Sequence, residues 1–146
     1  MLEYDQDIKG EDYRLLIEIA SEKCDKFAFV IRKDMMDDEK LAMKYYNELL
    51  KDIKSSLIEV KEESQWAVNI LLEATAYIYY YELNEQTKHF LQTKSNSLFG
   101  WINGLPEDLM FYNGDKIWLA CNSHESYFYI DEKDSQSKVF EILKKL

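Results

Sequence analysis

The stretch "LMFYNGDKIWLAC", from Leu109 to Cys121, constrains the fold more than any other part of the chain. It places Asn113 and Gly114 between two aromatic-rich runs, and Asn-Gly is the preferred pair where both turn residues need a positive φ. This pattern predicts a tight hairpin of two antiparallel strands. The polar segment "NSHES" predicts a second turn, and "YFYI", from Tyr127 to Ile130, predicts a third strand that completes a meander.

The first third of the chain alternates between helix and strand patterns. Apolar residues at helical spacing, after an acidic first turn, predict a helix over residues 11–24. The run "KFAFVIRK" has five successive apolar residues at 27–31, which is typical of a central strand covered on both faces. A second helix begins after Asp37 or Asp38 as its N-cap, and its apolar face consists of Ala42, Tyr45, Tyr46, Leu49, Leu50 and Ile53.

The middle of the chain has the two-residue period of β-strands. Ile58 and Val60 alternate with charged residues, which predicts a half-exposed strand. A longer apolar face follows at the even positions Trp66, Val68, Ile70, Leu72, Ala74, Ala76, Ile78 and Tyr80. One unbroken strand of this length would far exceed the usual five or six residues, so we expect a bend or bulge near Glu73.

The remaining helices complete a single α+β domain over residues 1–146. Asn84 is the expected N-cap of a helix over 85–94, a turn of helix is expected over Leu98 to Ile102, and an amphipathic helix begins near Asp134 or Ser135. The order α-β-α-β-β-α-β-β-β-α predicts a mostly antiparallel sheet of about five or six strands with helices packed on one side. Residues 1–10 are expected to be loosely ordered.

The charge balance argues against two classes of partner. Acidic residues outnumber basic ones 28 to 18, which gives a net charge of −10. Phosphate backbones and anionic lipid surfaces would repel such a surface, so we expect neither nucleic acid nor membrane as a partner. The N-terminus lacks the pattern of a secretory signal, and two distant cysteines indicate reduced thiols, so we expect a cytoplasmic protein.

Cys121, His124 and Glu125 are the one set of residues that suggests catalysis. On a single strand Cys121 and His124 would point to opposite faces, and the nearby carboxylates disfavour a thiolate. We therefore favour a buried cysteine beside a solvated turn histidine, and expect neither metal nor cofactor. A small hydrolase that uses these three residues remains the alternative. It could be zinc-dependent, because Cys121-x-x-His124 resembles half of a zinc site; the remaining possible ligands are Cys24 and His89.

Tyrosines form the most suggestive surface pattern. Tyr77, Tyr79 and Tyr81 alternate along one strand, and the hairpin strands add Tyr112, Tyr127 and Tyr129. Exposed tyrosines are typical of protein interfaces, and acidic neighbours would attract a basic partner. We list as candidate protein-binding residues these six tyrosines with Glu107, Asp108 and Glu125. Two alternatives stay open, in which helices cover the rings or the stripe is a symmetric dimer interface.

The segment "GLPEDLMFYNGDKIWL" resembles a known class of proteins over Leu105 to Leu119. It is similar to the immunity proteins of bacterial polymorphic toxin systems, the SUKH-type family among them, and the whole chain is similar in texture to small proteins of prophages and mobile elements of Gram-positive bacteria. The resemblance implies a mode of action in which a rigid acidic surface blocks or sequesters a partner protein.

These observations predict a non-enzymatic protein-binding module. Its most concrete form is an immunity or inhibitor protein that blocks a toxin, or a host or phage-defence protein, through an acidic, tyrosine-rich surface with a basic counterpart. The alternatives are the hydrolase described above and a small-ligand sensor with an aromatic pocket.

Overall fold

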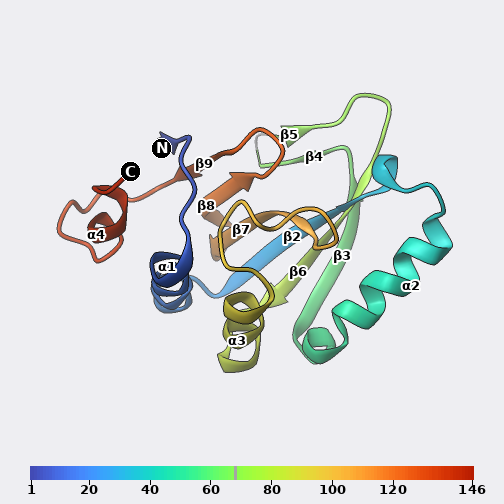
Figure 1. Cartoon of the computed structure of the whole chain (residues 1–146), viewed down its shortest axis with the longest axis horizontal. Helices are drawn as coiled ribbons and strands as arrows, with labels where there is room; N and C mark the ends of the chain where they lie inside the picture. Colours follow the sequence, from blue (N-terminus) through green and yellow to red (C-terminus); the bar gives the residue numbers. More distant parts are fainter. Residues whose placement is uncertain (68) are drawn as a thin grey trace.

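The protein is a single α+β domain whose centre is one seven-stranded antiparallel sheet (Figure 1). The computed structural model describes residues 1–67 and 69–146, so Val68, expected on the even-numbered apolar face, lies outside the described residues. The strand order is β1-β9-β8-β7-β2-β6-β3. The strands are β1 (Leu2–Tyr4), β2 (Lys26–Arg32), β3 (Leu57–Glu63), β6 (Ala76–Glu82), β7 (Glu107–Asn113), β8 (Lys116–Asn122) and β9 (Tyr127–Ile130).

The predicted central strand is confirmed. β2 lies between β7 and β6 and pairs with both of them. Phe27, Phe29 and Ile31 point into the main core on the helix side, whereas Ala28 and Val30 belong to a smaller cluster on the opposite side. Both faces of β2 are therefore buried, which explains its continuous apolar run.

All the helices lie on one side of the sheet. They are α1 (Gly10–Lys23), α2 (Glu39–Leu49), α3 (Glu85–Lys94) and α4 (Phe140–Leu143), with the 3₁₀ helices η1 (Lys33–Met35) and η2 (Lys51–Ser56). Residues of α1, α3 and α4 share the main core, and side chains of α2 pack against it. Two of the predicted caps are confirmed: Asp38 accepts a hydrogen bond from Leu41 N, and Asn84 forms a capping box with Thr87. The third is wrong, because α4 begins at Phe140 without a side-chain cap, and Asp134 instead accepts from Gln136 N in a turn before it.

The predicted break in the long apolar stretch is also confirmed. β4 (Gln65–Trp66) and β5 (Asn69–Ile70) pair as a small separate sheet, and β6 begins only at Ala76. Glu73 lies in the break and has a φ of 60°. Trp66 joins the smaller apolar cluster, so this segment covers part of the sheet face that has no helix.

The β7–β8 hairpin is confirmed, but its turn is displaced by one residue. Asn113 pairs with Lys116, so the turn residues are Gly114 and Asp115. Of these two, only Gly114 has a positive φ, of 61°. The turn therefore needs one glycine in the left-handed region rather than the predicted Asn-Gly pair.

Two expectations about local order are corrected. Leu2–Tyr4 is not loose but forms the edge strand β1, which pairs with β9. Residues 98–102 form turns instead of the expected turn of helix. There, the Asp7 carboxylate accepts the Phe99 N–H at 2.9 Å, and Leu98 N donates to Ile8 O at 3.0 Å, so long-range partners replace helical hydrogen bonds.

Candidate functional site

Two cavities meet at Arg32, which lines both of them. The first, here called the α2 groove, has a volume of about 420 Å³ and lies between α2 and the end of β2. Its apolar lining residues are Val30, Ile31, Met35, Met36, Leu41, Ala42, Tyr45 and Tyr46. The second, here called the polar pocket, has a volume of about 300 Å³ and is lined by Arg32, Trp66, Asn69, Ile70, Leu71, Asp108, Asn122, His124 and Glu125.

The α2 groove exists because α2 is only loosely covered. No residue of this amphipathic helix is fully buried, and the side chains of Leu41 and Tyr45 are exposed. Two hydroxyls anchor the helix: Tyr45 donates to Gly104 O at 2.6 Å, and Tyr77 donates to Glu39 at 3.0 Å. Part of the apolar face of α2 therefore lines the groove instead of filling the core.

A bulge in β7 sends two neighbouring carboxylates into different cavities. The register between β2 and β7 shifts between Ala28 and Val30, opposite Asp108, which has a φ of 55°. An extra residue in one strand re-aims the side chains around it. As a result, Glu107 lines the α2 groove and Asp108 lines the polar pocket.

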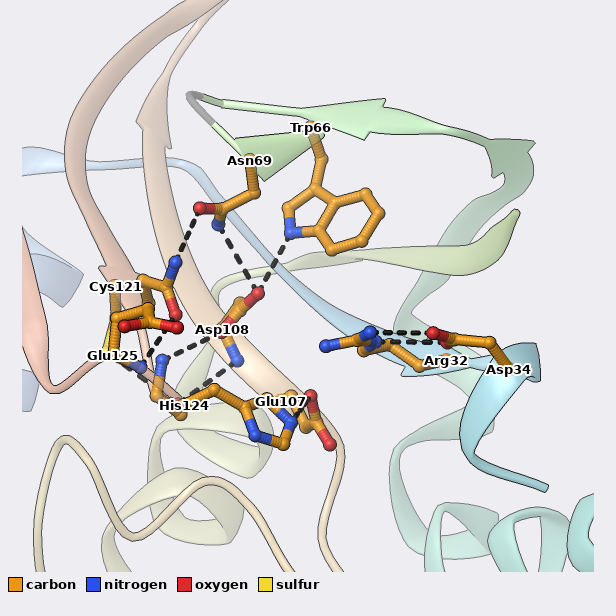
Figure 2. A network of polar contacts seen from close by, with 11 residues as sticks. Arg32, Asp34, Trp66, Asn69, Glu107, Asp108, Cys121, His124 and Glu125 are labelled. Carbon is orange, nitrogen blue, oxygen red and sulfur yellow. Dashed lines mark hydrogen bonds and ion pairs between the residues drawn. The ribbon is translucent and has the colours of Figure 1, made fainter. Parts of the chain in front are cut away.

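Asp108 is a buried carboxylate whose two oxygens both accept hydrogen bonds (Figure 2). It accepts hydrogen bonds from Ser123 N at 2.8 Å, Trp66 Nε1 at 3.0 Å and Asn69 Nδ2 at 3.3 Å. Burial raises the pKa of Asp108, and the hydrogen bonds from Ser123 N and Trp66 oppose the rise. The side chain thereby joins β7 to the β8–β9 turn and to the β4–β5 segment.

Glu107 faces His124 but keeps an oxygen without an aligned donor. The two side chains point toward each other in Figure 2, and His124 Nε2 lies 2.8 Å from Glu107 Oε2. The contact is an ion-pair distance, yet Oε2 is enclosed and takes no hydrogen bond of good geometry among the described residues. Burial raises the pKa of Glu107, while His124 opposes the rise.

Arg32 is held by a carboxylate of its own. Its Nε and Nη2 donate to the two oxygens of Asp34 at 3.0 and 2.7 Å. This bidentate pair raises the pKa of Arg32 and lowers the pKa of Asp34. Asp34 balances the charge of Arg32. The two cavities therefore carry an excess of negative charge from their other acidic residues, which are Asp37, Asp38, Glu107, Asp108 and Glu125.

Cys121 and His124 have different partners although they lie in one region (Figure 2). The Cys121 thiol is buried, with Sγ 3.7 Å from Ser123 Oγ, and burial raises its pKa. Such a thiol is a poor nucleophile at neutral pH. Glu125 is exposed, and within residues 1–67 and 69–146 no group of three or more His, Cys, Asp or Glu is placed to hold a metal ion.

The six candidate tyrosines do not form one surface. Tyr77, Tyr79 and Tyr81 face the helix side, where Tyr81 is buried in the main core. Tyr112, Tyr127 and Tyr129 lie on the opposite side, because Phe128 and Ile130 occupy the helix side of β9. The acidic candidates Glu107, Asp108 and Glu125, by contrast, are brought together around the two cavities.

Sequence reasoning did not identify Arg32, Asp34, Trp66 and Asn69 as site residues. Trp66 and Asp108 are 42 positions apart, and no spacing pattern joins them. Arg32 carried one usable signal, because it is one of only two arginines and ends the central strand.

Comparisons with protein-family models, with curated proteins and with solved structures find no match for this chain. Among the helices of the described residues, none is long and apolar enough to cross a bilayer.

Proposed function

We propose that this chain is a non-enzymatic protein-binding module whose α2 groove receives a basic, amphipathic segment of a partner protein. The observation that carries the proposal is an apolar groove of about 420 Å³ beside exposed Leu41 and Tyr45, with Asp37, Asp38 and Glu107 around it. Helices that bind in apolar grooves present side chains at positions i, i+3, i+4 and i+7.

Charge supports a basic segment over other occupants. The chain has a net charge of −10, and Asp37 and Asp38 are exposed at the start of α2. Lysines or arginines of a partner would meet these carboxylates while its apolar side chains displace water from the groove. A second copy of this chain is a poorer occupant, because it would bring the same acidic residues.

The most concrete form of this function is a cytoplasmic immunity or inhibitor protein of a bacterial or prophage system. The segment that resembles immunity proteins, Leu105 to Leu119, contains Glu107 and Asp108 of the β7 bulge. In this form the partner is a toxin, or a host or phage-defence protein, with a basic surface. Binding at the groove would block that surface without any chemistry.

Leu41→Gln tests this function against Leu15→Gln as a matched control. Both leucines are exposed on helices, at 65% and 42%, but Leu15 lies on α1 and does not line the groove. Gln keeps helix propensity, so neither variant should lose its fold. We expect Leu41→Gln to lower the affinity for the captured partner at least about tenfold, a loss of about 1.4 kcal/mol of binding free energy. The affinity of Leu15→Gln should be close to that of the wild type.

The measurement is affinity capture from the native host, followed by titration of the captured protein. Equal affinity of the two variants would contradict the groove as the binding site. Recovery of no protein partner by the wild-type chain would contradict the function itself.

A further inference from the structure

A second apolar cavity lies on the other side of α2. It has a volume of about 340 Å³ and is lined by Leu50 after α2, by Leu57 and Val60 of β3, and by Tyr79 and Tyr81 of β6. We call it the tyrosine pocket. Its size falls within the range of about 300–1,000 Å³ that is usual for small-molecule sites.

The two tyrosines form one wall because they are two residues apart on the same strand. Side chains at positions i and i+2 share a face of the sheet, and the rings of Tyr79 and Tyr81 lie with centroids 6.4 Å apart and planes at 21°. Val60 pairs with Tyr79 across β3 and β6, and the aliphatic side chains of Leu50 and Leu57 complete the lining. The wall therefore suits a flat apolar body.

Tyr81 carries a polar atom that the protein leaves without a partner. The residue is 1% exposed, yet its hydroxyl makes no hydrogen bond among the described residues, and neither does that of Tyr79. Buried hydroxyls are nearly always hydrogen-bonded. The Tyr81 hydroxyl is not one of the fully enclosed unpaired atoms of the described chain, so it keeps some accessible surface, and Tyr81 lines the cavity.

The charged residues that line this cavity are lysines, whereas the lining of the α2 groove includes three carboxylates. Asn47, Lys51 and Lys54 complete the lining. Lys51 pairs with Glu48 at 2.6 Å, whereas Lys54 has no ion pair within the described residues. A ligand in this cavity therefore meets apolar walls, a phenol hydroxyl and an ammonium group.

We propose that the tyrosine pocket binds a small aromatic carboxylic acid. The aromatic ring lies between the partly buried Tyr79 ring and Leu50 or Leu57, the carboxylate pairs with Lys54, and the Tyr81 hydroxyl bonds a polar substituent on the ring. This site is separate from the α2 groove and does not depend on the proposed protein partner.

Thermal-shift and calorimetric titration of the full chain with 4-hydroxybenzoate tests the site. The neutral 4-hydroxybenzamide serves as the matched probe, because it keeps the ring and the hydroxyl but lacks the charge. We expect the acid to raise the melting temperature with the logarithm of its concentration above Kd, and the amide to bind at least about tenfold more weakly.

Two variants and two controls locate the binding. Tyr81→Phe and Lys54→Gln should each weaken binding of 4-hydroxybenzoate about tenfold or more. The controls are Tyr129→Phe, on the opposite sheet face, and Lys116→Gln, exposed beside the β7–β8 turn; both should bind as the wild type does. Without ligand, Tyr81→Phe should be at least as stable as the wild type, because its hydroxyl has no partner to lose.

Two results would overturn the proposal. One is the absence of any shift with 4-hydroxybenzoate and a panel of related aromatic acids. The other is a shift that remains unchanged in both Tyr81→Phe and Lys54→Gln. Either result would leave the function of the α2 groove untouched, since the capture experiment uses neither residue.

Discussion

Glu107 and Asp108 show how neighbouring residues of one type acquire different roles. Asp108 accepts hydrogen bonds from three donors in two segments, the β8–β9 turn and the β4–β5 segment, and so holds these segments to β7. Glu107 retains an oxygen without an aligned donor and lines the groove. The sequence predicts both as surface acids for a partner; Asp108 is buried, whereas the Glu107 side chain is 12% exposed and lines the groove.

Glu107→Gln should separate stability from binding. Folding raises the pKa of Glu107 above its ordinary value, mainly through burial, so the charged form lowers stability at neutral pH. This penalty is present above the native pKa and disappears as acidification protonates the native carboxyl. We therefore expect Glu107→Gln to melt no lower than the wild type at pH 7, with a difference that shrinks as the pH falls.

The same substitution should lower the affinity for the basic partner. On acidification the wild-type chain should also lose affinity, and this loss should begin at a higher pH than it would with a glutamate of ordinary pKa. Melting curves and binding titrations across pH measure both effects. Asp5→Asn, an equal change of charge next to the edge strand β1, is the control. A lower melting temperature for Glu107→Gln at pH 7 combined with unchanged binding would contradict this role.

At the scale of elements, sequence patterns identified α2 and its cap but not its exposure. Helical spacing and Asp38 predict the helix correctly, because both signals are local. How much of the apolar face is covered depends on the distance to the sheet, which no local pattern contains. The tyrosine stripe was left open between an interface and a covered face for a related reason: β6 is apolar on both faces, so a two-residue period cannot say which face the helices cover.

The cap of α2 offers a test of its role. Asp38→Ala removes the side-chain acceptor for Leu41 N and should cost about 0.5–2 kcal/mol of stability. Asn84→Ala, which removes the cap of α3, should cost a similar amount. Chemical denaturation measures the stabilities, and titration of the partner measures binding. Asp38→Ala should lower the affinity for the partner, and Asn84→Ala should leave it unchanged. Equal affinity of the two variants would contradict a role for α2 in binding.

At the scale of the whole molecule, α2 separates two surfaces of opposite character. The α2 groove on one side has acidic neighbours, and the tyrosine pocket on the other has lysines at its edge. The order of helices and strands along the chain predicted the α+β class and the antiparallel sheet, since both depend on periodicity within local segments. Neither cavity was predictable, because each joins residues from elements far apart in sequence.

The central claim is that an acidic groove captures a basic partner, and the association rate measured against ionic strength tests it most directly. Steering by a net charge of −10 predicts that the rate falls at least about tenfold between ~0.01 M and ~1 M salt, while the dissociation rate changes less. An association rate that is indifferent to ionic strength would contradict the claim.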